Sequence, residues 1–191
     1  MPFILASSSP RRKELLESIG IIPDKILAPH VDETPLKGEG IKTYVQRIAT
    51  LKARVIHAQN PTAYVLAADT AVEARRQIFL KPETPEEARK TLELFSGRRH
   101  RVYTAVCALS PEGKEASRLV TTRISFKSLS TQEIEAYIST EEWEGKAGSY
   151  SIQGRAAKFV KFISGSYTNV VGLPLYETDC LLKGIGFVFN S

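Results

Sequence analysis

The sequence predicts an α/β protein in which a mixed, twisted sheet with flanking helices forms two lobes around a cleft. In the first half, short apolar runs alternate with segments of helical period, which favours parallel strands joined by helical crossovers. In the second half, apolar runs follow one another across turn-forming residues, as in antiparallel hairpins. The chain has no repeat, linker or low-complexity segment, so residues 1–191 are predicted to form a single domain.

The composition excludes several classes of protein. With 42% hydrophobic and 25% charged residues, the chain is typical of globular proteins. No apolar run approaches a membrane span and the N-terminus lacks a signal-peptide pattern, so we expect a cytoplasmic protein without membrane contact. Cys107 and Cys180 lack metal-ligand spacing, which predicts buried thiols in a reducing compartment. A net charge of +5 favours an anionic partner, either a nucleotide or a nucleic acid.

The first strand and helix lie at residues 3–5 and from Pro10 onward. Ser9 is suited to the N-cap, and Pro10 to the first helical position, where its missing N–H costs nothing. Gly20 is suited to the left-handed residue that ends a helix. The expected apolar face of this helix consists of Leu15, Leu16 and Ile19.

The first turn of this helix carries three cations, Arg11, Arg12 and Lys13. A helix N-terminus is itself partly positive, so these cations oppose the dipole. A bound anion would resolve the conflict, because the serines at 7–9, the free N–H groups and two guanidinium groups could all bind phosphates. A phosphorylation site, a DNA minor-groove arm and a solvated basic face are alternative interpretations of the same residues.

A second strand is predicted at residues 25–27, followed by a Pro- and Gly-rich loop that ends near Gly40. The loop contains Asp32 and Glu33, which by themselves indicate a solvated turn. A helix follows over residues 43–58, and Lys52 borders its apolar stripe as an expected surface lysine. The residues of that stripe are Tyr44, Ile48, Leu51 and Val55.

A buried strand is predicted at residues 64–68, with Asp69 and Thr70 directly after it. Ligands of open α/β sheets bind just beyond the carboxyl ends of strands, so a carboxylate at this position is well placed for chemistry. An aspartate that merely ends the strand is the alternative.

The next elements are a hairpin and a helix. Residues 71–73 and 78–80 are expected to pair across a turn that lacks the usual Gly or Asn. Thr84 then caps a helix, with Pro85 at the first position and Glu87 completing a capping box. The buried face of this helix is predicted to be Ala88, Leu92 and Phe95, with Gly97 at its end.

Residues 98–101 form the most basic run in the chain, and strands are predicted at 102–109 and 118–126 as an antiparallel pair. Ser130 and Glu133 form a second capping box at the start of a helix. A second hairpin is expected from residues 157–163 and 167–171, and a last helix after Pro174.

Six blocks of this sequence, in order and in spacing, resemble the Maf family. The resemblance covers nearly the whole chain. The blocks are residues 5–12 (LASSSPRR), 68–70 (ADT), 81–82 (KP) with 86–88 (EEA), 96–102 (SGRRHRV), 146–154 (KAGSYSIQG) and 165–174 (GSYTNVVGLP). The sequence departs from the family pattern at Leu80, Trp143 and Gly145, where many members have Gly, Pro and Asp.

The resemblance implies an elongated mixed sheet with a central cleft, related to the inosine triphosphatase fold. It also implies a cytoplasmic house-cleaning enzyme that splits nucleoside triphosphates into a monophosphate and diphosphate with Mg²⁺ or Mn²⁺. The substrates would be dTTP, UTP or modified pyrimidine nucleotides. No nucleic-acid partner is expected, and a homodimer is an expectation from the family alone.

The resemblance assigns residues by position. Asp69 matches the general base, while Arg11, Thr70 and Gln153 match the positions that mark the dTTP/UTP-hydrolysing branch. Other polar residues that match the family's pocket are Ser7, Arg12, Glu33, Lys52 and Lys81.

The chemistry of triphosphate cleavage adds roles for these residues. Ser7, Ser9, Arg12, Lys52 and Lys81 would bind phosphates. Glu33 would join Asp69 as an oxygen ligand of the metal. Gln153, which has both a donor and an acceptor, can match the edge of uracil or thymine.

Two other functions fit parts of the sequence. A nucleic-acid-binding module would use Arg75, Arg76 and the basic run at 98–101, although aromatic residues are not interleaved with these cations. A non-catalytic regulator of septation, the role after which the family is named, is the third possibility. Asp69, Lys81 and Gln153 are all retained, which favours an active enzyme.

Overall fold

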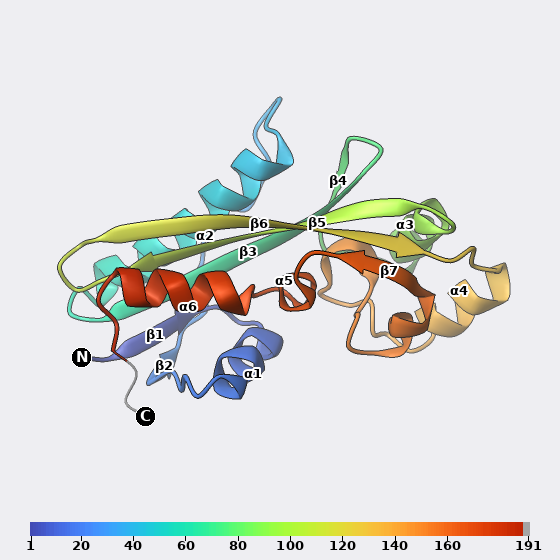
Figure 1. Cartoon of the computed structure of the whole chain (residues 1–191). Helices are drawn as coiled ribbons and strands as arrows, with labels where there is room; N and C mark the ends of the chain where they lie inside the picture. Colours follow the sequence, from blue (N-terminus) through green and yellow to red (C-terminus); the bar gives the residue numbers. More distant parts are fainter. Residues whose placement is uncertain (189–191) are drawn as a thin grey trace. The chain divides into compact units, whose positions relative to one another are not determined.

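The computed structural model describes residues 1–188, within which seven strands form one mixed sheet (Figure 1). The hydrogen-bonded order is β2-β1-β3-β5-β6-β7, and β4 pairs with β3. The strands are β1 (Phe3–Ala6), β2 (Lys25–Ile26), β3 (Tyr64–Ala74), β4 (Gln77–Phe79), β5 (Arg99–Leu109), β6 (Glu115–Phe126) and β7 (Val160–Ser164). The predicted α/β class with a mixed sheet is confirmed.

Six α-helices and two short 3-10 helices, η1 and η2, complete the described part of the chain. They are α1 (Pro10–Ser18), α2 (Ile41–Gln59), α3 (Pro85–Phe95), α4 (Thr131–Ile138), η1 (Ala147–Ser149), η2 (Arg155–Phe159), α5 (Tyr167–Val171) and α6 (Leu175–Gly184).

The chain divides into two compact units. Unit 1 comprises Met1–Asp69, Thr104–Val120 and the chain from Gly172 onward. Unit 2 comprises Thr70–Tyr103 and Thr121–Val171. Each unit is therefore built from segments that are distant in the sequence.

Parallel pairing in unit 1 begins at the N-terminus. β1 is parallel to β2 and to β3, with Ile4 opposite Val65. Every residue of β1 is buried, as expected of a parallel strand that is covered on both faces. Figure 1 shows α2 behind this part of the sheet and α6 in front of it.

Helix α1 begins as predicted, with Ser9 in extended conformation and Pro10 at the first helical position. The Ser9 hydroxyl makes no capping bond. The apolar face is shorter than expected, because Leu15 and Leu16 are buried whereas Ile19 is 40% exposed. The reason is that α1 ends at Ser18, so Ile19 lies outside the helix.

The buried stripe of α2 differs from the predicted one. Tyr44, Ile48, Lys52 and Ile56 are buried at intervals of four residues, whereas Leu51 and Val55 are only half-buried. The buried face is therefore shifted around the helix from the predicted one, and the predicted surface residue Lys52 lies in the middle of the buried stripe. Its exposed fraction is 6%.

Strand β3 is longer than predicted. It continues to Ala74, so Asp69 and Thr70 lie within the strand and not beyond its end. The backbone is therefore in strand conformation on both sides of the buried Asp69.

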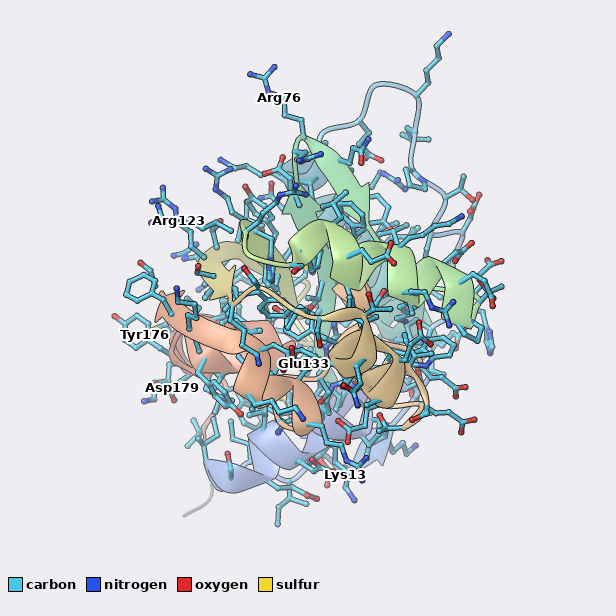
Figure 2. The ribbon with its side chains drawn as sticks, turned by 90° about the vertical axis from the view of Figure 1, so that its right-hand side faces the viewer. Lys13, Arg76, Arg123, Glu133, Tyr176 and Asp179 are labelled. Atoms are coloured by element: carbon cyan, nitrogen blue, oxygen red, sulfur yellow. The ribbon has the colours of Figure 1, made fainter. Side chains whose placement is uncertain are left out.

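The predicted hairpin in unit 2 is confirmed. β3 and β4 are antiparallel, with Ala74 opposite Gln77. Arg75 and Arg76 therefore form a two-residue turn, and their φ angles are 51° and 62°. Figure 2 shows the Arg76 side chain pointing away from the ribbon at the tip of this hairpin.

The two predicted capping boxes have different outcomes. At α4 the box is complete, because Ser130 and Glu133 each accept a backbone N–H from the other. At α3 the Thr84 side chain accepts from the Glu87 N–H, but the Glu87 carboxylate accepts from Glu83 and not from Thr84. The predicted buried face of α3 is confirmed.

The second predicted hairpin is wrong. Only residues 160–164 form a strand, which pairs with β6, while residues 155–159 form η2 and residues 167–171 form α5. The helix is favoured because Ser166 Oγ accepts the Asn169 N–H at 3.2 Å. The buried Asn169 amide then donates to Thr122 Oγ1 at 2.9 Å and to the Val102 carbonyl at 3.2 Å.

Both cysteines are free thiols, as predicted. Cys107 is buried, but Cys180 is exposed on α6, so the expectation for Cys180 is wrong. Its position on the outer side of a surface helix is the reason. Across residues 1–188, none of the helices combines the length and the apolar character that a membrane span requires.

Candidate active site

Three charged side chains of unit 1 converge on one point. The Lys52 ammonium lies 2.8 Å from Asp69 Oδ1 and 2.8 Å from Glu33 Oε1. Lys52 and Asp69 are each only 6% exposed, whereas Glu33 is half-buried. Helix α2 supplies the lysine, β3 the aspartate and the loop before α2 the glutamate. A buried charge is costly unless it is paired, so this cluster indicates a functional site.

Arg12 connects the start of α1 to a distant part of unit 1. Its Nε donates to the Gly172 carbonyl at 2.8 Å, and its Nη1 donates to Ser7 Oγ at 3.2 Å. Ser7 Oγ also accepts the Ser9 N–H at 3.1 Å. The guanidinium group is held by two bonds that need its planar shape.

Arg12 also acts electrostatically on the carboxylates of the cluster. Burial is the largest influence and lowers the pKa of Arg12, and the charges of Asp69 and Glu33 oppose this effect. The residues Ser7, Ser9, Arg12, Glu33, Lys52 and Asp69 are therefore linked by direct contacts or by charge within unit 1. The family resemblance assigned Ser7, Arg12, Glu33 and Lys52 to the pocket together with Lys81, with Asp69 as the general base, and Ser9 was predicted as a phosphate ligand.

The three first-turn cations of α1 differ in orientation. Lys13 is 48% exposed and pairs with Glu17 at 3.5 Å on the outer side of the helix, where Figure 2 labels it. Arg11 is half-buried, and burial lowers its pKa while Glu14 opposes this. The solvated-face interpretation therefore holds for Lys13 but not for Arg12.

Burial raises the pKa of the Asp69 carboxyl above its ordinary value, while Lys52 and Arg12 act in the opposite direction. An ordinary aspartate is a weak base at neutral pH. The raised pKa makes Asp69 a better proton acceptor than an exposed aspartate.

The loop that carries Glu33 is anchored at several points. The buried Tyr44 hydroxyl donates to the Glu33 carbonyl at 3.0 Å. Arg47 donates to both oxygens of Glu39 at 2.7 Å and to the Thr34 carbonyl at 3.1 Å. Asp32 accepts the Thr34 N–H at 2.9 Å and is exposed, which confirms its predicted role in a solvated turn.

The donor set fits a divalent cation only in part. Glu33 and Asp69 present oxygens to one point, and Mg²⁺ is commonly held by one or two carboxylates together with substrate phosphates and water. Among residues 1–188, His, Cys, Asp and Glu side chains form no group of three or more that could hold a metal by themselves. A metal at this site would therefore depend on phosphate oxygens.

Three predicted site residues belong to unit 2. Thr70 is the half-buried residue after Asp69 on β3, and Lys81 is exposed after β4. Gln153 is exposed in a tight turn, in which the Gly154 N–H donates to the Ser151 carbonyl at 3.2 Å.

Side chains hold both ends of the Gln153 turn. The Ser151 N–H donates to the Tyr137 hydroxyl at 2.9 Å, and the Arg155 N–H donates to Glu142 Oε2 at 2.7 Å. A Cβ atom on Gly154 would lie 2.0 Å from Glu142 Oε2. The Glu142 carboxylate therefore lies directly against Gly154, and a side chain at position 154 would displace it.

Four residues that position the site were not predicted from the sequence. They are Tyr44, Tyr137, Glu142 and the carbonyl of Gly172. The spacing of Tyr44 and Lys52 on one helical face is the only local signal among them, since the other contacts join residues that are far apart in the sequence.

The fold resembles that of the Staphylococcus aureus Ham1 protein. The TM-score is 0.52 at 14% sequence identity, and the match covers 95% of this chain and 98% of that chain. At this identity the likeness shows the fold alone, which is a mixed α/β fold.

The family model for the Maf-like protein matches residues 2–185. The dTTP/UTP pyrophosphatase of Sphingopyxis alaskensis is 52% identical over 183 residues, covering 96% of each chain. That of Paramagnetospirillum magneticum is 51% identical over 184 residues, covering 96% of this chain and 97% of the relative. The chain belongs to the Maf family.

Proposed function

We propose that this chain is a nucleoside triphosphate pyrophosphatase that hydrolyses dTTP and UTP to the monophosphate and diphosphate. The relatives described above carry the name of this activity at about half identity over nearly their full length. The buried Asp69–Lys52 pair beside Arg12 is the observation that carries the proposal within this chain.

In the reaction, the oxygen of a water molecule bonds to one of the two phosphorus atoms of the α–β anhydride. The bond from that phosphorus to the bridging oxygen breaks, and the bridging oxygen stays on the other product, so that the monophosphate and diphosphate separate. Asp69 accepts the proton of that water, because burial raises its pKa. Arg12 and the N-terminus of α1 bind the negative charge of the phosphates. Lys52 offsets the charge of Asp69 and of the phosphate oxygens.

A divalent ion, Mg²⁺ or Mn²⁺, would be held by Glu33 and Asp69 and would lower the pKa of water and neutralise phosphate charge. Ser7 keeps Arg12 in place and shares the phosphate-binding N-terminus with Ser9. Lys81, an exposed cation of unit 2, is a further phosphate ligand in this proposal.

Base selection is assigned to Gln153, Arg11 and Thr70. The Gln153 amide has the donor and the acceptor that a uracil or thymine edge requires. The rigid turn that carries Gln153 supports this role. A modified pyrimidine nucleotide as the cellular substrate, a cytoplasmic location and a homodimer remain predictions based on the family resemblance.

Diphosphate release from a panel of nucleotides with Mg²⁺ or Mn²⁺ tests the activity. We expect dTTP and UTP to be hydrolysed and the Asp69→Asn variant to lose at least about a thousandfold in kcat, the scale of losing a general base together with its charge. Asp32→Asn is the matched control, since Asp32 is exposed in a turn and should retain normal turnover. Near-normal turnover by Asp69→Asn would remove Asp69 from the base role.

Specificity has a separate test. Gln153→Glu should reduce kcat/KM for dTTP and UTP by about tenfold to a hundredfold. The variant loses one hydrogen-bond donor to the base edge and adds a negative charge, which repels the negatively charged nucleotide. The measurement is kcat/KM of the wild-type protein and of the Gln153→Glu variant for dTTP, UTP and two other nucleotides. Unchanged selectivity would mean that the base is recognised elsewhere.

A further inference from the structure

Lys52 lies where the oxygens of the two predicted metal ligands converge. Its Nζ is 2.8 Å from both Glu33 Oε1 and Asp69 Oδ1. A divalent cation that uses these same oxygens would have to share them with the ammonium or displace it. The inference below rests on the proposed function, since it concerns how that site is loaded.

The charges around this point are already balanced. Glu33 and Asp69 carry two negative charges, and Lys52 and Arg12 carry two positive charges that act on Asp69. A divalent ion alone would add two positive charges to a neutral, largely buried cluster. A triphosphate tail would supply the negative charge that is missing.

We propose that the Lys52 ammonium is a resident counter-ion that keeps a divalent cation from binding stably until the nucleotide arrives. With the phosphates present, Lys52 exchanges its carboxylate partners for phosphate oxygens, and the metal takes the Glu33 and Asp69 oxygens. Metal and nucleotide then enter together, and each raises the affinity of the other by the same factor.

The structure of α2 favours this role for Lys52. The residue is buried between Ile48 and Ile56 on the helix stripe, so its ammonium is held at the carboxylates and away from bulk solvent. The long, flexible stem of lysine allows the ammonium to move between neighbouring oxygens, which a rigid guanidinium would not allow.

Mn²⁺ binding measured by calorimetry or by the spectrum of free Mn²⁺ tests the inference without any turnover. Wild-type protein alone should bind Mn²⁺ weakly. Addition of an α,β-imido analogue of dUTP should tighten Mn²⁺ binding by about a hundredfold, after correction for Mn²⁺ held by the free analogue.

Removal of the Lys52 charge should tighten Mn²⁺ binding in the absence of nucleotide. Lys52→Met and Lys52→Gln should each bind Mn²⁺ about tenfold more tightly than wild type, since a cation next to the metal is lost. The nucleotide analogue should then add less than it does in wild type. Lys42→Met removes the same charge from the exposed side of α2 and should leave Mn²⁺ affinity unchanged.

Two variants keep the test decisive, because Lys52→Met leaves two carboxylates without a donor and could unfold. Lys52→Gln retains an N–H donor of similar length. Equal or weaker Mn²⁺ binding by the folded Lys52 variants would overturn the inference. If wild type hydrolyses UTP in that case, the proposed function stands and only the role of Lys52 is lost.

Discussion

At the scale of single residues, each unit contains titratable side chains that are buried. In unit 1, Lys52 and Asp69 form an ion pair that is almost completely removed from solvent. Such pairs contribute little to stability, because desolvation offsets their attraction, but removal of one partner is costly. The pair is therefore better explained by function than by stability.

His100 is a buried histidine of unit 2. It is 2% exposed, stacks on Phe95 at 4.2 Å, and its Nε2 lies 2.9 Å from the Tyr150 hydroxyl. Within the described residues its Nδ1 has no hydrogen-bond partner. Burial lowers the pKa of His100 from 6.5 to about 3.

This pKa predicts acid sensitivity of the fold. Below about pH 6.5 the unfolded chain binds a proton that the folded chain excludes down to about pH 3, so stability falls as the pH falls through this range. From pH 6.5 to pH 5 the loss should be about 2 kcal/mol. Urea unfolding at several pH values measures it.

The comparison variant is His100→Phe, which keeps the stacking on Phe95 but cannot take up a proton. Its stability at neutral pH should fall, because the Tyr150 hydroxyl loses its partner. Its stability difference between pH 6.5 and pH 5 should shrink by about 2 kcal/mol relative to wild type. If the stability of the His100→Phe variant fell as steeply below pH 6.5 as that of wild type, His100 would not be the cause of the acid sensitivity. His57→Gln is the control for loss of another histidine.

At the scale of elements, the turn between β3 and β4 is strained. Two-residue hairpin turns of this kind require positive φ at both central positions, where Asn-Gly is strongly preferred. Arg75 and Arg76 occupy these positions with φ of 51° and 62°. A side chain with a Cβ atom pays roughly 1–2 kcal/mol for such a conformation.

Relief of this strain should stabilise the protein. The double variant Arg75→Asn, Arg76→Gly should raise the free energy of unfolding by about 1–2 kcal/mol. Urea or thermal unfolding gives the value. The double variant Arg75→Gln, Arg76→Gln removes both charges and keeps both Cβ atoms, so it should give no such gain. An equal gain in that control would attribute the effect to charge.

A substitution in the Gln153 turn is expected to disturb the protein, unlike the substitutions at Arg75 and Arg76. Gly154→Ala places a Cβ atom against the Glu142 carboxylate, so the bond from the Arg155 N–H must lengthen or break. We expect the turn to shift and KM for UTP to rise by about tenfold, with a smaller change in kcat, because substrate positioning is lost rather than the chemical step.

Gly184→Ala is the matched control for this substitution, since nothing lies within 4 Å of its Cβ position at the end of α6. Alanine there should be neutral or slightly stabilising. The kinetic constants for UTP of the two variants are the measurement. A Gly154→Ala enzyme with unchanged KM would show that the close approach of Glu142 has no part in placing Gln153.

At the scale of the whole molecule, distant segments assemble each unit. The partners of Arg12 include Ser7, which is near in sequence, and the carbonyl of Gly172, which is 160 residues away. Local patterns can indicate that Arg12 breaks the rule for a helix N-terminus, but they cannot identify a partner at that distance. The residue types of the site were therefore predictable and their contacts were not.

The same distinction separates the correct and incorrect predictions of secondary structure. The starts of α3 and α4 were predicted because capping residues act on the backbone within one turn. The second hairpin was wrong because residues 167–171 are apolar enough for a strand, and the helix depends on Asn169 bonds to β5 and β6 in addition to the Ser166 cap. No signal within that segment reports those bonds.

By itself, the sequence determined the α/β class, the starts of α1, α3, α4 and α6, the β3–β4 hairpin and the family, because each depends on spacing over short distances or on residue blocks in order. Tertiary structure alone decided that Asp69 lies inside β3, that Lys52 is buried, and that its ammonium joins Glu33 to Asp69. The physical reason is that burial and charge pairing depend on which surfaces pack together. A lysine beside an apolar stripe is compatible with solvent or core until its neighbours are in place.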